Sequence, residues 1–153
     1  MKTWAKYGLI NSLLGLVIGI FVTITSLGGG YYSFIIVIPI SMFLTGSLSW
    51  KFIIKDSNDK SKVFITGLFT GTLSHYLTFV LVSIGMNICY WTTGNCTSSL
   101  NEPPESILNM LGAGFVYSFF SLIFFGWLTI IFSIATGHII LRSENKKVKK
   151  DLN

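Results

Sequence analysis

Four long apolar stretches, separated by short polar segments, dominate the pattern of hydrophobic and polar positions along the 153-residue chain. They cover residues 7–27, 31–54, 63–88 and 107–141. Each is at least as long as the roughly 20 apolar residues with which an α-helix crosses the hydrocarbon core of a bilayer. The pattern predicts an all-α, polytopic membrane protein in which four transmembrane helices form one bundle, a single domain over residues 1–153.

The first stretch allows a second interpretation, because Lys2 and Lys6 precede it as basic residues precede the core of a signal peptide. Such a core is usually only about 7–15 residues long and ends in a cleavage site of small residues. Here the apolar stretch is longer, and Ser26-Leu27-Gly28 is a poor cleavage site. We therefore predict a retained helix.

The last stretch would form about 50 Å of helix at 1.5 Å per residue, which is enough for one long helix or for two spans. Two spans would need a turn, and no polar turn residues lie around Gly126-Trp127. We predict one helix, bent at Gly112-Ala113-Gly114, followed by a frayed cytoplasmic tail over residues 142–153.

The charges indicate how the helices are oriented. All eleven Lys and Arg residues lie in the N-terminus, in residues 51–62 or in the tail, whereas the connections on the other side carry only Glu102 and Glu105. Basic residues favour the cytoplasmic side of a membrane. This predicts a cell (inner) membrane protein with both termini in the cytoplasm and residues 89–106 as an outer loop. The net charge of +5 then reflects orientation rather than nucleic-acid binding.

His75 lies near the middle of the third stretch, and ionisable side chains within a membrane are often functional. Two interpretations are open. The imidazole is neutral and hydrogen-bonds a Ser or Thr of another helix, or it belongs to a proton relay or ligand site with the polar residues Ser74, Thr78 and Asn87. A relay usually needs a carboxylate partner, and none of the four stretches contains Asp or Glu.

Two pairs of glycines have the four-residue spacing that lets membrane helices approach closely: Gly15 with Gly19, and Gly67 with Gly71. They predict either packing within the bundle or contact with a second copy or a larger membrane protein.

Cys89 and Cys96 are the only two cysteines, and both lie in the predicted outer loop. An oxidising compartment would allow them to pair, so we predict a disulfide. Their spacing is not the Cys-x-x-Cys of redox-active pairs, and two cysteines with two distant histidines do not predict a zinc site.

Known catalytic motifs are absent: the chain has no G-x-S-x-G, no H-E-x-x-H and no phosphate-binding glycine loop. We therefore predict no catalytic residues, no metal and no cofactor, and these absences disfavour an enzyme without excluding one.

Two short stretches carry a family resemblance, Lys6-Tyr7-Gly8-Leu9 and the segment Val63 to Gly71. They resemble an uncharacterised family of four-helix membrane proteins common in Bacteroidetes. The resemblance implies a four-helix membrane fold and no particular activity.

Three functional classes follow from these observations. The first is an accessory or interaction subunit of a membrane complex, or an immunity-type protein, with the lipid bilayer and a larger membrane protein or a second copy as partners. The second is a small-solute channel or carrier with a polar path around His75. A membrane enzyme is the least supported of the three.

Overall fold

The computed structural model describes residues 2–26, 31–54, 59–97 and 102–151, and their side chains as far as Asn145. Every regular element in these ranges is helical, which confirms the predicted all-α class. Four helical segments are long and apolar enough to cross a membrane: Thr3–Thr25, Ser33–Ile54, Lys60–Thr93 and Ile107–Asn145.

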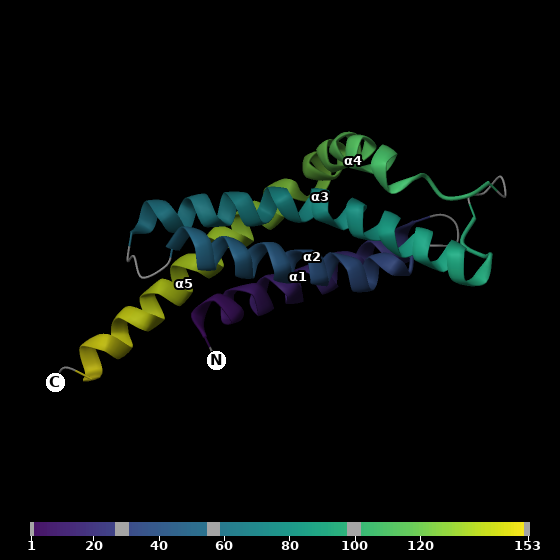
Figure 1. Cartoon of the computed structure of the whole chain (residues 1–153). Coiled ribbons are helices and arrows are strands. Elements are labelled where there is room, and N and C mark those ends of the chain that lie inside the picture. Colours follow the sequence, from purple (N-terminus) through teal and green to yellow (C-terminus); the bar gives the residue numbers. More distant parts are fainter. Residues whose placement is uncertain (1, 27–30, 55–58, 98–101, 152–153) are drawn as a thin grey trace.

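The first two helices form an antiparallel hairpin (Figure 1). The helix α1 covers Thr3–Thr25, and α2 covers Ser33–Ser49 and continues as a π-helical turn, η1, over Trp50–Ile54. Pro39 lies inside α2 without ending it. Thr23 Oγ1 donates a hydrogen bond of 3.0 Å to the carbonyl of Tyr31, which ties the end of α1 to the start of the next helix.

The third helix, α3, covers Lys60–Thr93. Asp59 caps its first turn by accepting a hydrogen bond of 2.9 Å from the backbone N–H of Ser61. Gly94 ends it in the left-handed conformation, with φ of 70°, which glycine adopts without steric cost. The helix therefore continues through Thr93, and the first residues of the predicted loop 89–106 are helical.

The fourth apolar stretch forms three successive elements. They are α4 over Ile107–Ser121, a π-helical turn η2 over Leu122–Gly126, and α5 over Trp127–Asp151. Ser106 caps α4 by accepting a hydrogen bond of 3.2 Å from the N–H of Asn109. The tail 142–153 was predicted to be frayed, and this was wrong as far as Asp151, because α5 continues through it.

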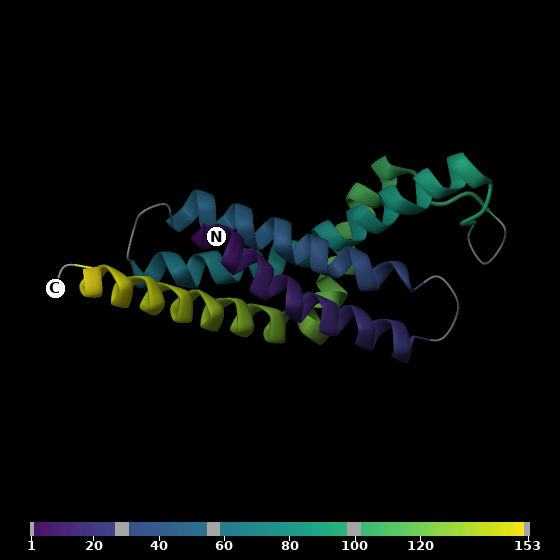
Figure 2. The same ribbon diagram turned by 90° about the horizontal axis from the view of Figure 1, so that it is seen from below.

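The fourth helix changes direction within η2, so that α4 crosses α3 instead of extending the line of α5 (Figure 2). The predicted bend at Gly112-Ala113-Gly114 was wrong. That segment is regular α-helix, and Gly114 lies against the ring of Tyr76. The bend lies instead where a wider π-turn interrupts the α-helix, a feature that is frequent at functional sites.

Both described ends of the chain, the end of η1 and the start of α3 lie at one end of the bundle, here called the Lys-rich end (Figure 1). There α1, α2, α3 and α5 pack around a small apolar core. Its buried members are Tyr7, Trp50, Ile54, Val63, Ile140 and Leu141. The end of α1, the start of α2 and the end of α3 with the disulfide lie at the opposite end, which we call the disulfide end.

Polar side chains fill most of the remaining interior. Among the described residues, fifteen buried polar side chains outnumber eight buried apolar ones, while large apolar side chains cover the outside. Most of the polar ones are Ser or Thr, and several hydroxyls donate to the carbonyl four residues earlier, as Thr66, Thr78 and Thr45 do. Small, internally bonded side chains let helices approach closely, and this composition is typical of membrane helix bundles.

Candidate functional site

The bend in the fourth helix accompanies a cavity of about 240 Å³ in the half of the bundle nearer the disulfide end. At this level α4 packs on α3, and the fourth helix contributes Ser121 at the end of α4, Phe125 of η2 and Thr129 of α5 to the cavity. Phe125 of η2 contacts Phe21 of α1 edge-on, with 6.2 Å between ring centroids. The walls are mostly apolar and include Ile18, Phe34, Met42, Phe79 and Phe125.

One side of the cavity is polar, and it is formed by α3 and the bent fourth helix. Its members are Ser74, His75, Thr78, Ser121 and Thr129. The structure thus brings three predicted residues, His75, Ser74 and Thr78, to one wall and adds two hydroxyls from a distant part of the chain.

His75 connects the two sides of the bend. Its Nδ1 lies 2.7 Å from Ser121 Oγ, at the end of α4, and its Nε2 lies 3.1 Å from Thr129 Oγ1, in the first turns of α5. The imidazole therefore bridges α3 to residues before and after the π-turn. We call this arrangement of His75, Ser121 and Thr129 the histidine clamp.

The hydrogen-bond network assigns the tautomer of the clamp. The hydroxyl of Thr129 has two carbonyl acceptors, Gly126 at 3.0 Å and Gly71 at 3.2 Å, so its proton points to them and its oxygen accepts from His75 Nε2–H. Nδ1 then accepts from the hydroxyl of Ser121. Both ring nitrogens are satisfied in the neutral form, which corresponds to the first of the two interpretations of His75.

This arrangement limits the chemistry of His75. Its two nitrogens bond to hydroxyls of the same chain, and no Asp, Glu, Lys or Arg lines the cavity. In the described part of the chain, no three His, Cys, Asp or Glu residues are grouped as a metal ion would require. The clamp is therefore suited to holding helices in position.

Asn87, the fourth predicted polar residue, lies apart from the cavity. Its Nδ2 donates hydrogen bonds of 2.9 Å to the carbonyls of Ser83 and Glu105. The second bond ties the segment that leads into α4 to α3. Asn87 thus positions the start of the crossing helix rather than contributing to a site with His75.

Both glycine pairs lie at contacts within the chain. A Cβ atom on Gly67 or Gly71 would meet the backbone of Ile134 or Ile130 of α5 at less than 3 Å. In the other pair, a Cβ atom on Gly19 would meet the carbonyl oxygen of Phe34 at 2.7 Å, and one on Gly15 would meet the Cα of Pro39 at 3.0 Å, both in the backbone of α2. The structure therefore places these glycines where α3 meets α5 and where α1 meets α2.

A second polar cluster was not singled out from the sequence. Tyr7 OH donates to the carbonyl of Ser133 at 3.1 Å, and Ser133 Oγ donates to Asn11 Oδ1 at 2.6 Å. Asn11 Nδ2 in turn donates to the carbonyl of Tyr7 at 2.9 Å. The cluster joins α1 to α5. The sequence signal that could have predicted it was Asn11, a carboxamide side chain inside an apolar stretch.

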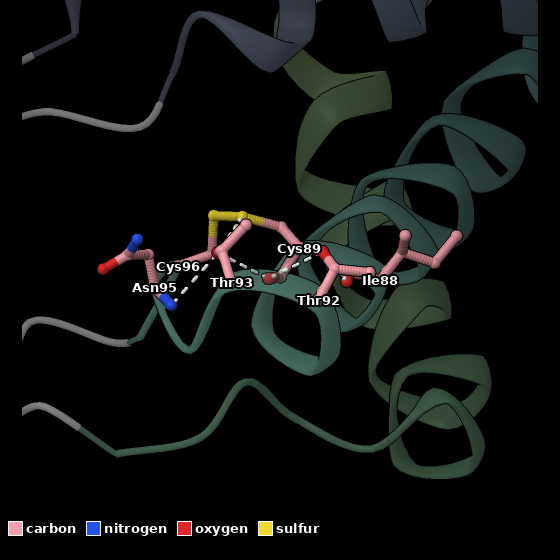
Figure 3. Close-up of a disulfide and its surroundings, with 6 residues drawn as sticks. All are labelled: Ile88, Cys89, Thr92, Thr93, Asn95 and Cys96. Carbon is pink, nitrogen blue, oxygen red and sulfur yellow. Dashed lines mark hydrogen bonds between the residues drawn. A yellow bond between two sulfur atoms is a disulfide. The ribbon is translucent and has the colours of Figure 1, made fainter.

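The two cysteines are joined by a disulfide between the last turn of α3 and the segment after Gly94 (Figure 3). Thr93 Oγ1 donates to the carbonyl of Cys89 at 2.8 Å and accepts from the N–H of Asn95 at 3.2 Å. The bridge and the threonine together fold the chain back on the end of the helix.

The disulfide predicts a simple thiol count. Denatured protein alkylated without reductant should gain no adduct by intact mass, because the described cysteines include no free thiol. The same protein should gain two adducts after reduction, which controls for alkylation efficiency. Two adducts on unreduced protein from native membranes would show that the loop lies in a reducing compartment.

Comparisons with protein-family models, with curated proteins and with solved structures found no match to this chain. The resemblance to the Bacteroidetes family therefore stays a prediction, and the functional argument depends on the geometry alone.

Proposed function

We propose that the chain is a multi-pass protein of the cell (inner) membrane that acts as an accessory subunit of a larger membrane complex. An immunity-type protein, which binds and neutralises a toxin in the membrane, is one form of this role. The proposal has two parts, insertion with both termini in the cytoplasm and binding of a partner protein through the bent fourth helix.

The distribution of side chains supports insertion. Large apolar residues such as Val17, Ile36 and Phe64 are more than half exposed, and the described interior is mostly polar. Such an exterior needs lipid as its solvent. In the described part of the chain, every Lys and Arg lies in or beside a helical segment end that is at the Lys-rich end, which supports a cytoplasmic location for that end.

The observation that carries the partner proposal is a stripe of exposed apolar side chains on the fourth helix. Its members recur every three to four residues through α4, η2 and the start of α5, and all are more than half exposed: Val116, Phe119, Phe120, Ile123, Phe124 and Trp127. We call this set the aromatic stripe. Aromatic residues are enriched in the centres of protein interfaces.

The alternative, a small-solute channel or carrier, has less support. Its polar path would begin at the clamp, where the hydroxyls and the imidazole already bond to one another. Toward the Lys-rich end, Tyr7, Trp50 and Val63 are buried against each other, and the rings of Tyr7 and Trp50 are 4.6 Å apart. A solute would have to displace this layer.

The test is gentle extraction of the tagged chain from its native membrane, followed by native mass spectrometry. We expect a stoichiometric second polypeptide with the unaltered chain and its loss with the double variant Phe119→Ala, Phe124→Ala. The matched control, Leu13→Ala with Val17→Ala, shortens two exposed side chains of α1 and should retain the partner.

Two results would contradict the proposal. A chain that is extracted without any second polypeptide has no stable partner, and the stripe then faces lipid. A partner that is retained by the stripe variant and lost by the α1 control binds elsewhere. Solute flux in reconstituted vesicles that His75→Ala abolishes would favour the carrier instead.

A further inference from the structure

We propose that the cavity beside the histidine clamp binds one hydrocarbon chain of a membrane lipid. The chain would lie between Ile18, Phe34, Phe79 and Phe125, with its headgroup near Tyr31. This inference depends on the membrane insertion proposed above and is independent of the partner protein.

The size of the cavity suits a chain. An apolar cavity of about 150 Å³ accommodates benzene, and sites for drug-sized ligands have roughly 300–1,000 Å³. The cavity here, at about 240 Å³, lies between these limits. It has room for a length of hydrocarbon chain but is small for a bulky solute.

The chemistry of the walls excludes a strongly polar ligand. His75 and Thr129 are bonded within the clamp, and Thr78 Oγ1 donates to the carbonyl of Ser74 at 2.8 Å. No charged side chain is among the lining residues. A polar solute would lose its hydrogen bonds to water without gaining equivalent ones in the cavity. A hydrocarbon chain makes no hydrogen bonds, so it has none to lose on entering.

Tyr31 marks the end of the cavity at which a headgroup would lie. It precedes α2 at the disulfide end, lines the cavity and is 38% exposed. Tyrosine favours the boundary between hydrocarbon and water. The sequence places only Glu102 and Glu105 as charges at this end, so it offers no cation to an anionic headgroup. A neutral or zwitterionic lipid fits best.

Acyl chains and isoprenoid chains share the chemistry that the walls recognise, and the experiment separates them. The full-length protein is reconstituted into phosphatidylcholine vesicles that contain one of two probes. The first probe is phosphatidylcholine with a diazirine in the middle of one acyl chain, and the second is an isoprenoid alcohol with a diazirine. After illumination, mass spectrometry maps the labelled residues.

We expect saturable labelling at cavity residues such as Phe34 and Phe79, and the probe that gives it identifies the type of chain. Thr78→Phe fills the cavity from α3, and Ile18→Phe fills it from α1. Losing two buried methylene groups lowers binding about tenfold, so each variant should reduce cavity labelling by about that factor. Leu73→Phe, on an exposed part of α3, is the matched control and should leave it unchanged.

The map of labelled residues in the wild-type protein tests the proposal even if a filling variant does not fold. Labelling spread over the exposed faces of all helices, without enrichment at the cavity, would overturn the proposal, as would cavity labelling that both folded filling variants leave unchanged. Extraction of the reconstituted protein with alkali is checked first. If alkali removes the protein from the vesicles, the protein is not inserted in the membrane. If the protein is retained but its cavity is not labelled, only the lipid-site proposal is contradicted.

Discussion

Replacing Gly71 with valine is expected to lower the free energy of unfolding by about 3 kcal/mol, the upper part of the usual range for overpacking a well-packed interior. A Cβ atom on Gly71 would lie 2.7 Å from the Cα and 2.8 Å from the backbone nitrogen of Ile130. These are backbone atoms of α5, so no side-chain rotation can relieve the contact. The two helices would have to separate along the contact that holds the fourth helix in the bundle.

The matched control is Gly85→Val in the same helix, because no heavy atom lies within 4 Å of a Cβ atom built there. Unfolding is followed by circular dichroism during titration of dodecyl sulfate into mixed micelles. Gly85→Val should change the stability by less than about 1 kcal/mol, the range of intrinsic helix propensities. A Gly71→Val protein as stable as the control would mean that α3 and α5 are not in the close contact described here.

The same pair of variants distinguishes the two predictions made for the glycines. If Gly67 and Gly71 served contact between copies of the chain, Gly71→Val would change the oligomeric state and leave the monomer folded. Because α5 of the same chain covers both glycines, we expect the monomer itself to be destabilised. The mass of the complex in native mass spectrometry, measured beside the unfolding curve, separates these outcomes.

The architecture could be predicted because its cause is local. A run of about 20 apolar residues has to be a helix in a membrane, where each backbone polar group must be bonded internally. The four stretches therefore predicted where each helix lies, although α3 extends beyond 63–88 at both ends and α5 continues past the predicted end at residue 141 to Asp151. Asp59 and Gly94 set these ends through capping, which hydrophobic length does not reveal.

The site depends on contacts between residues far apart in sequence, and these were not predictable. His75 was found as a polar residue in an apolar stretch, and a Ser or Thr partner on another helix was among the interpretations. Which hydroxyls it meets depends on the π-turn at Leu122–Gly126, which brings Ser121 and Thr129 to one ring. Nothing in the local sequence distinguishes this turn from regular α-helix, so the bend was placed at a glycine-rich segment instead.

Replacing His75 with alanine is expected to release the bend between α4 and α5 and to lower the free energy of unfolding by about 2 kcal/mol. It removes two hydrogen bonds, each worth about 1 kcal/mol, and leaves Ser121 without the acceptor that it has in the clamp. Because the clamp joins α3 to both sides of the π-turn, its loss should let α4 take several directions relative to α5.

Nitroxide labels at the exposed positions Leu108 of α4 and Ile139 of α5 would report this motion through double electron–electron resonance. We expect one narrow distance distribution for the unaltered protein and a broad one for His75→Ala. Thr129→Val removes one bond of the clamp with little change in shape, but it also removes the donation of the hydroxyl to the carbonyls of Gly71 and Gly126, so it should cost a similar amount, about 2 kcal/mol. Thr72→Val removes a hydroxyl that bonds only within its own helix and should have the unaltered distribution.

The distances separate the clamp from a purely local role of the imidazole. If His75→Ala lost stability but kept a narrow distribution, packing around the π-turn would hold the bend without the clamp. If the distribution broadened, the direction of the crossing helix would depend on bonds from His75 to two side chains that lie 46 and 54 residues further along the chain. The arrangement of the aromatic stripe and the shape of the cavity would then both depend on the clamp, because both depend on the bend that the clamp holds. The Thr129→Val variant should accordingly weaken partner binding as well as lipid labelling, although Thr129 lines only the cavity and lies outside the aromatic stripe.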